Sequence, residues 1–458
     1  MANKNILTYG AKVKQVEQLY YSPVAITPPS TTPFTSTYCF LAKVDPWSNE
    51  DNPPAPTQDQ KTIKKIFKNM FVVKQIKTSE ISPVIARIDW STGIVYDYYR
   101  DDIDILEQDN NGNNIYNFYV KNRYDQVFKC LWNNNGAVSI VEPYFQPGSY
   151  GTNNIYTGTD GYKWKYIYTV DTGSKVKFMD ATWMPVPVTS YAPNPLLTTA
   201  GVGSIDVINV FDGGHNYSTN NLTTITITGD GTGCVAVANV SGNVVADITV
   251  TAPGSNYTYA NVTITSPSGV GAIAYANTSP VGGHGTDPIS ELGCTHVMFT
   301  SEFNGDEGGV IPTDIDFHQV GLLFNPTSLA TTPYPANGSI YRTTTDFITA
   351  PGFGAYTPDE IVFQVPVGVN PILENATYTA TVLSFDVASN VVKLLNTTGI
   401  PKTNSPVYGD TSKTTRTLLS VSAPNLTIHS GYIGFIENRT GVQRSNDGIE
   451  QFKFVLGY

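Results

Sequence analysis

Side chains that commonly bind transition metals are sparse in this sequence of 458 residues. No two of its histidines stand at the H-x-H or H-x-x-x-H spacing that brings two imidazoles to one metal ion, and no C-x-x-C pair occurs. The histidines are His215, His284, His296, His318 and His429, and the cysteines are Cys39, Cys130, Cys234 and Cys294. The sequence therefore predicts no zinc site and no disulfide framework, but four reduced, buried thiols of a protein made in the cytosol.

Carboxylates and nucleophiles give no stronger indication of catalysis. A G-x-S-x-G elbow is absent, and Asp212-Gly-Gly-His215 is typical of a turn rather than of half a catalytic triad. Asp306 with Glu307, and Asp314 with Asp316, provide carboxylate pairs that a glycosidase needs, but any acidic β protein supplies such pairs. We expect that the protein is not an enzyme.

Two kinds of loop resemble ligand-binding motifs but lack residues that those motifs require. The segment that begins at Glu107 has parts of a calcium loop, but its twelfth position is Phe118, where a bidentate glutamate is required. The Asn110–Asn113 part of that segment instead indicates a hairpin or tight turn. The Gly-rich turns at 229–233 and 266–271 lack the Lys-Ser/Thr and the helix of a phosphate-binding loop. The sequence therefore predicts no cofactor.

Charge is distributed unevenly. The formal net charge is −11, and no Lys or Arg occurs between Lys177 and Arg342, an interval that holds twelve acidic residues. Such an interval cannot clamp phosphates, and an anionic membrane surface would repel it, so we expect neither nucleic-acid nor membrane binding. The N-terminus has no apolar signal segment, and no apolar run is long enough for a membrane span.

One amphipathic helix is predicted near residues 59–71. Ile63, Ile66, Phe67, Met70 and Phe71 recur at helical spacing, and Thr57 with Gln60 has the spacing of a capping box. The opposite side carries Lys61, Lys64, Lys65 and Lys68. This lysine face suits either an acidic partner or solvent, and a solvated face is the simpler interpretation.

Elsewhere polar and apolar residues alternate with a period of two, as they do in β-strands with one buried face. Residues 224–228 and 262–265 alternate strictly, and 208–217 matches 248–257 as an internal repeat. Two strand-turn-strand copies are expected to pack together as an all-β module at 201–281. Because the cation-free interval contains this module, we expect the module to project from the frame and to meet a basic neighbour there, if one exists.

Further strands are predicted at 379–386 and 391–395, as a hairpin, and at 450–456. Low charge, 28 tyrosines and 69 Gly and Pro residues favour a mainly β protein rich in turns. We expect a multi-domain sandwich-like or barrel-like frame with one N-terminal amphipathic helix and inserted β modules. The expected regions are 1–200 (frame), 201–281 (inserted repeat), 282–334 (frame), 335–425 (inserted β segment) and 426–458 (final strands).

Several segments, in order, resemble one family. They are Asp45-Pro-Trp-Ser-Asn-Glu-Asp-Asn-Pro-Pro54 with the helix and Arg87-Ile-Asp-Trp90, Gly161-Tyr-Lys-Trp-Lys-Tyr166, Phe317-His-Gln-Val-Gly321 with Asn325-Pro326, His429-Ser-Gly431 with Glu437-Asn-Arg439, and the Gln451–Leu456 strand. The sequence is similar to the baseplate wedge subunit known as gene product eight in T-even-type contractile-tail bacteriophages. His318 replaces the usual Arg of that family, and 201–281 and 335–425 resemble insertions.

The resemblance implies a structural subunit without enzymatic activity. Such a subunit forms a homodimer, joins other baseplate wedge proteins, is assembled in the host cytoplasm and resides in the virion tail baseplate, which reorganises when the tail contracts. It also marks candidate core or interface anchors, namely Trp47, Trp90, Trp164, Phe317, His429, Glu437 and Arg439. Core packing is the simpler role for the three tryptophans, and Arg439 beside Glu437 is expected to order a C-terminal turn.

A carbohydrate-binding tail adhesin, or receptor-binding protein, is the alternative. Tyrosine suits both protein contacts and sugar stacking, and tyrosines are frequent between residues 96 and 162. They include Tyr98, Tyr99, Tyr116, Tyr119, Tyr144, Tyr150, Tyr156 and Tyr162. A host surface glycan is therefore a second possible partner, although ordinary sheet tyrosines would look the same.

Overall fold

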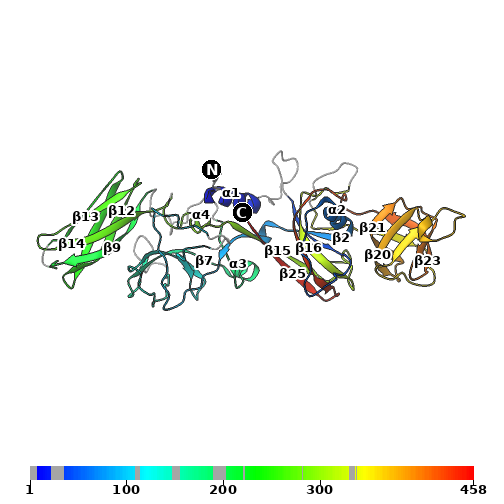
Figure 1. Cartoon of the computed structure of the whole chain (residues 1–458), viewed down its shortest axis with the longest axis horizontal. Helices are drawn as coiled ribbons and strands as arrows, with labels where there is room; N and C mark the ends of the chain where they lie inside the picture. The colour runs from blue at the N-terminus through cyan, green and yellow to red at the C-terminus, as the bar shows by residue number, and fades with distance from the viewer. Residues whose placement is uncertain are drawn as a thin grey trace. The chain divides into compact units, whose positions relative to one another are not determined.

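The computed structural model describes residues 8–21, 36–108, 114–146, 155–188, 203–219, 222–280, 282–329, 336 and 338–458. The turn expected at Asn110–Asn113 lies outside these residues. The described chain is mainly β, which confirms the predicted fold class (Figure 1).

The chain divides into two units. Unit 1 comprises Met1–Tyr20, Ser82–Met298 and Val455–Tyr458, and unit 2 comprises Tyr21–Ile81 and Phe299–Phe454. The unit boundaries fall at the end of α1 (Tyr9–Tyr21) and inside β3 (Ile81–Ala86), β15 (His296–Asn304) and β25 (Ile449–Gly457). The region 1–200 that sequence reasoning treated as one frame therefore contributes to both units.

Unit 1 contains a four-stranded antiparallel sheet in the order β4 (Tyr119–Lys121), β5 (Gln126–Asn133), β7 (Tyr162–Thr169), β6 (Ile155–Thr157). Aromatic side chains fill its core, including Tyr96, Phe128, Phe145, Tyr162 and Trp164. Three short elements also belong to this unit: α3 (Thr172–Phe178), β8 (Trp183–Pro185), which pairs with β3, and α4 (Pro288–Glu291).

The internal repeat folds as one β structure within unit 1 (Figure 1). The first copy supplies β9 (Ile205–His215), β10 (Thr224–Gly229) and β11 (Thr232–Ser241), and the second supplies β12 (Val244–Ser255), β13 (Ala260–Thr265) and β14 (Val270–Thr278). Strands of the two copies alternate in one four-stranded sheet, in the order β11, β12, β9, β14. Strands β10 and β13 pair with each other. Neither copy buries its apolar face alone.

Matching tyrosines explain the Gly-rich turns of the repeat. Tyr217 and Tyr257 are both buried, and a Cβ atom added to Gly269 or Gly231 would lie 2.3 or 2.4 Å from the respective ring. A side chain at either glycine would therefore collide with the ring. The glycines of these turns therefore leave room for the tyrosine rings.

Unit 2 contains a five-stranded sheet covered on one face by α2 (Gln60–Asn69). Its strand order is β17 (Ile340–Arg342), β2 (Met70–Gln75), β1 (Thr37–Ala42), β16 (Asp316–Phe324), β24 (Tyr432–Gln443). Tyr38, Phe40, Val73 and Leu323 pack with Ile66 and Phe67 of the helix. Strand β24 therefore forms one edge of this sheet.

A closed six-stranded barrel also belongs to unit 2, and its core contains Phe347, Val382, Val392 and Leu418. Its order is β18 (Thr345–Thr349), β21 (Val391–Gly399), β20 (Tyr378–Asp386), β19 (Ile361–Gln364), β22 (Pro406–Gly409), β23 (Thr415–Ser422). Strands β20 and β21 form the predicted hairpin. The described residues also contain two 3-10 turns, Thr78–Glu80 and Leu373–Asn375.

The predicted helix is confirmed, with two corrections. It ends at Asn69 rather than at 71, because Met70 and Phe71 begin β2. Its N-cap is Asp59 rather than Thr57, since the Asp59 carboxylate accepts from the backbone N–H groups of Lys61 and Thr62 at 3.0 Å. A carboxylate next to the first turn replaces the expected capping box. The described part of the chain contains three further helices that were not predicted, α1, α3 and α4.

Candidate functional site

Most of the sequence-predicted site residues gather in unit 2 around the edge strand β24. These are Trp47, Phe317, His429, Glu437 and Arg439, which come from chain segments separated by up to 392 residues. The two remaining candidates, Trp90 and Trp164, lie in unit 1. The edge of β24 in unit 2 is therefore the candidate site.

Trp47 fixes the segment before α2 onto the second half of β24. Its indole Nε1 donates to the carbonyl oxygen of Arg439 at 2.7 Å, and its ring meets the edge of the His318 ring with centroids 6.3 Å apart. The Trp47 side chain is half-buried. It is thus an anchor within this chain at the strand edge, and not a residue of the deep core.

Polar groups of the same segment cover the neighbouring residues of β24. The Glu50 carboxylate accepts from Gly441 N–H at 2.9 Å, which lowers the pKa of Glu50, and its carbonyl oxygen accepts from the Thr440 hydroxyl at 2.7 Å. The Asn438 amide donates to the carbonyl oxygen of Pro54 at 2.8 Å. The segment 47–54 therefore occupies the edge of β24 from Asn438 to Gly441.

Glu437 and Arg439 form the expected ion pair, with Arg439 Nε 3.2 Å from Glu437 Oε1. The expected location was wrong: both residues lie inside strand β24, at i and i+2 on one face, and not in a turn. The guanidinium of Arg439 also lies 5.4 Å from the ring centroid of Phe452, which contacts the buried Phe317 ring at 5.9 Å. The pair thus rests on the aromatic layer beneath the sheet.

His429 precedes β24 in a turn, with φ of +67°. Its ring packs edge-on against Phe67 of α2 at 5.3 Å. Partial burial and then the positive charges of Lys68 and Lys64 lower its pKa, so the imidazole is neutral at neutral pH. His429 therefore joins the start of β24 to the helix and lies close to the lysine face.

A groove lies between α2 and the first half of β24. Its volume is about 440 Å³, and its lining contains no charged side chain. The lining residues are Pro56, Gln58, Ile63, Phe67, Gly431, Tyr432, Ile433, Gly434, Phe435 and Ile436. A surface of this kind binds apolar side chains.

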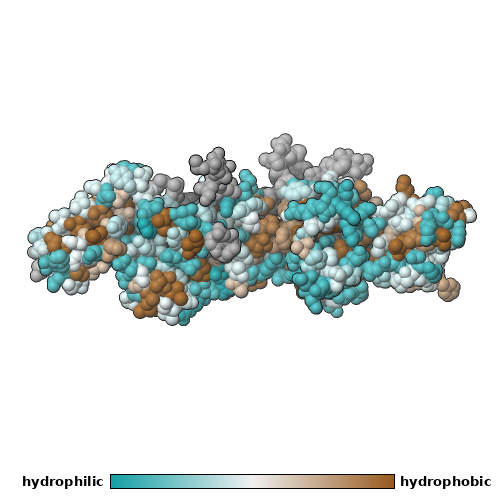
Figure 2. All heavy atoms as spheres, in the orientation of Figure 1, coloured by the Kyte–Doolittle hydropathy of each residue, from teal (hydrophilic) through white to brown (hydrophobic). Residues whose placement is uncertain are grey.

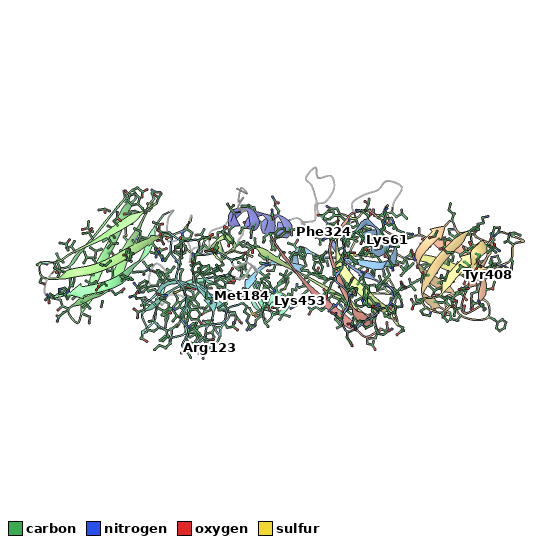
Figure 3. The ribbon with its side chains drawn as sticks, in the orientation of Figure 1. Lys61, Arg123, Met184, Phe324, Tyr408 and Lys453 are labelled. Atoms are coloured by element: carbon green, nitrogen blue, oxygen red, sulfur yellow. The ribbon has the colours of Figure 1, made fainter. Side chains whose placement is uncertain are left out.

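The lysine face of α2 borders this groove. Lys61, Lys64 and Lys68 recur at i, i+3 and i+7, so they share one flank of the helix, and none forms an ion pair with a described carboxylate. Lys65 lies beside Lys61 and Lys68 on the helix surface, at i+4 and i−3, but it has a carboxylate partner, because its Nζ lies 3.4 Å from Asp45. Figure 2 shows the hydrophilic surface over α2, and Figure 3 places Lys61 at that surface.

The two candidate tryptophans in unit 1 have different surroundings. Trp164 is fully buried and stacks on Tyr162 with centroids 5.5 Å apart, as a core residue does. Trp90 is half-buried, and its indole N–H donates to the Ser139 hydroxyl at 3.1 Å. Neither residue belongs to the strand-edge site.

Sequence reasoning missed a buried charge cluster in unit 1. Lys129 of β5, only 1% exposed, donates to Glu291 at 3.0 Å and to His284 at 3.2 Å, and it lies 4.0 Å from the Tyr99 ring centroid. Burial alone would raise the pKa of Glu291, but Lys129 and then His284 outweigh it and hold that pKa at about 2. Burial and Lys129 lower the pKa of His284.

A second buried lysine joins the repeat module to the β4–β7 sheet. Lys163 of β7 lies 2.7 Å from Asp247 of β12, and the Asn209 amide donates to the carbonyl oxygen of Leu131 at 3.1 Å. A basic neighbour of the acidic module therefore lies in the same chain. The sequence feature that could have indicated these buried lysines is the presence of lysine inside otherwise apolar strands, as in Tyr162–Tyr166.

Other predictions concern metal ions, thiols and membranes. In the described parts of the chain, no cluster of three His, Cys, Asp or Glu side chains has the geometry to hold a metal ion. The four cysteines are free thiols, three buried and Cys234 half-buried. Among the described residues, no helix combines the length and apolar character that crossing a bilayer requires.

Comparison with models of known protein families and with curated protein sequences finds no match to this chain.

Proposed function

We propose that this protein is a structural subunit of the baseplate wedge of a contractile-tail bacteriophage. In this proposal it forms a homodimer, links other wedge proteins, assembles in the host cytoplasm and resides in the virion tail baseplate. It has no enzymatic role.

One observation carries the proposal. Four of the segments that resemble the wedge family, although distant in sequence, make direct contacts around β24: Trp47 of the first binds the backbone of Arg439, and Arg439 covers Phe452, which packs on Phe317. Residues that touch one another are expected to be retained together in a family. Their convergence therefore supports the resemblance more strongly than the motifs do separately.

The chemistry of the site also suits assembly. The groove is apolar, the adjacent strand edge presents peptide groups, and uncompensated lysines border both. Surfaces of this composition recognise other polypeptides.

Light scattering and pull-down experiments with purified wedge subunits of a contractile tail test the proposal. We expect a dimer that co-purifies with at least one wedge subunit. A monomer that binds none of the subunits would contradict it. Specific binding to host polysaccharide without wedge association would instead favour the adhesin.

A further inference from the structure

We propose that the first half of β24, Tyr432–Glu437, receives an extended acidic segment of another polypeptide, which adds to the sheet as a strand and places its apolar side chains in the groove against α2. This inference rests on the proposed assembly function for the identity of its partner as another subunit. The chemistry of the added strand is inferred from the strand edge, the groove and the lysine face.

The backbone of β24 is available on one side. Among the described strands, β24 pairs only with β16, and no backbone hydrogen bond joins Tyr432–Glu437 to another described segment. In an antiparallel pair, alternate residues direct their N–H and C=O groups away from the partner. The first half of the strand therefore offers a row of donors and acceptors for a further strand.

The two halves of the same edge differ. From Asn438 to Gly441 the chain's own segment 47–54 supplies hydrogen-bonding groups to β24. From Tyr432 to Ile436 the edge borders the 440 Å³ groove instead. A strand spans about 3.4 Å per residue, so the free half matches about five or six residues of a partner.

The groove and its border define what the added strand must contain. Its walls are apolar, with Ile63 and Phe67 on the helix and Ile433 and Ile436 on the strand. Lys61, Lys64 and Lys68 supply positive charge that no described carboxylate neutralises. An acidic strand with alternating apolar residues complements both features.

A second copy of β24 would meet these requirements poorly. Between Tyr432 and Gln443 this strand carries one acid, Glu437, and one base, Arg439, which already pair with each other. It therefore brings no spare carboxylate for the three lysines. The charge favours a different segment as the occupant.

Fluorescence anisotropy of the full chain with a labelled peptide tests the inference. The probe is an alternating Glu/Val peptide of about nine residues, and the controls are its Lys/Val counterpart and an N-methylated version that cannot pair along both edges. We expect binding of the Glu/Val peptide that weakens as salt rises, and binding at least about fivefold weaker for either control. Equal binding of all three peptides, or no binding of the Glu/Val peptide, would overturn the inference.

A matched pair of variants locates the site. Lys64→Glu reverses an unpaired charge next to Ile63 of the groove, whereas Lys65→Glu reverses the neighbouring charge, which already pairs with Asp45. We expect Lys64→Glu to weaken peptide binding about fivefold and Lys65→Glu to leave it within about twofold. Equal effects of the two substitutions would overturn the assignment to the groove.

Filling the groove provides a test independent of charge. Gln58 lines the groove and is exposed, so Gln58→Trp should reduce peptide binding without disturbing the core. Unchanged binding would contradict the inference. If Lys64→Glu abolishes dimerisation in light scattering, the groove belongs to a second copy and the inference of an acidic partner fails.

Wedge association, measured by pull-down with the unmodified chain, separates the two proposals. Peptide binding without wedge association would retain this inference and reject the proposed function. If the unmodified chain binds no peptide, and the Lys64→Glu and Gln58→Trp variants still associate with wedge subunits, the proposed function is retained and this inference is rejected.

Discussion

Two pairs of lysines, Lys129 and Lys163 in unit 1 and Lys61 and Lys64 on α2 in unit 2, have opposite surroundings. In unit 1, Lys129 and Lys163 are buried in a sheet and each has a carboxylate within 3.0 Å. In unit 2, Lys61 and Lys64 are exposed on a helix, and neither has an ion-pair partner among the described residues. Buried charges require partners because desolvation is costly, whereas exposed charges do not. Lys129 and Lys163 therefore serve the fold, and Lys61 and Lys64 remain available for another molecule.

The tryptophans repeat this contrast. Trp164 in unit 1 is fully buried among aromatic rings, whereas Trp47 in unit 2 is half-buried and binds the backbone of an edge strand. The same residue type thus fills a core in one unit and covers an edge in the other. Substitutions at corresponding positions in the two units test this difference in burial.

The largest effect is expected from breaking the buried ion pair. Lys129→Ala leaves Glu291 buried without its main partner and should lower the free energy of unfolding by about 3–5 kcal/mol. Urea denaturation monitored by hydrogen exchange of β5 measures it. The double substitution Lys129→Met with Glu291→Leu is the control and should recover most of the loss. A loss below about 1 kcal/mol for Lys129→Ala would remove the contrast between the units.

A loss of similar size is expected at the core tryptophan. Trp164→Ala removes a fully buried indole and should cost about 3–5 kcal/mol in the free energy of unfolding. Thermal or urea unfolding measures the loss. Near-normal stability together with failed dimerisation would instead place Trp164 at a subunit interface.

Acid should destabilise unit 1 through Glu291. Its folded-state pKa of about 2 lies below the usual 4.5, so its contribution is complete above about pH 4.5 and is lost as the pH falls toward 2. The expected loss is about 3 kcal/mol. The lowered pKa of His284 adds a further loss that begins below pH 6.5, because the unfolded state then binds the proton first. Urea unfolding across this pH range should show a weaker dependence below pH 4.5 for Glu291→Gln than for the unmodified chain.

A smaller effect is expected where the chain covers its own strand edge. Trp47→Phe keeps the aromatic ring but removes the hydrogen bond to Arg439, and should cost about 1 kcal/mol. Hydrogen exchange should increase at Asn438–Gly441 and remain unchanged at Tyr432–Ile436. An equal increase along the whole strand would show that the two halves of β24 are not independent.

The smallest effect is expected on the lysine face. Lys64→Ala should change the free energy of unfolding by no more than about 0.5 kcal/mol, because the side chain is exposed and unpaired. Urea unfolding measures this change beside that of Lys129→Ala. A loss of more than about 1 kcal/mol would mean that the face supports the fold.

Local patterns in the sequence predicted much of the fold. The spacing of Ile63, Ile66 and Phe67 predicted α2, and strict alternation predicted the strands β10 and β13. Two strand-like runs separated by a short turn predicted the hairpin of β20 and β21. These features depend on residues that are close in sequence. The end of α2 was misplaced because Met70 and Phe71 continue the apolar pattern into a strand.

The candidate site depends on contacts between distant residues, which such patterns do not contain. The bond from Trp47 to Arg439 joins positions 392 residues apart, and the ion pair of Lys129 with Glu291 joins positions 162 apart. The resemblance to a family named Trp47, Glu437 and Arg439 but gave no geometry for them. The groove beside α2 requires the helix, the sheet and the edge strand together.

A cryo-electron map of a contractile tail that carries this chain tests the central claim most directly, namely that the protein is a wedge subunit that engages its neighbour through the free half of β24. We predict that the chain lies in the baseplate, with an extended strand of another polypeptide beside Tyr432–Glu437 and acidic side chains facing Lys61, Lys64 and Lys68. A baseplate that lacks this chain, or one in which the first half of β24 faces solvent, would contradict the account.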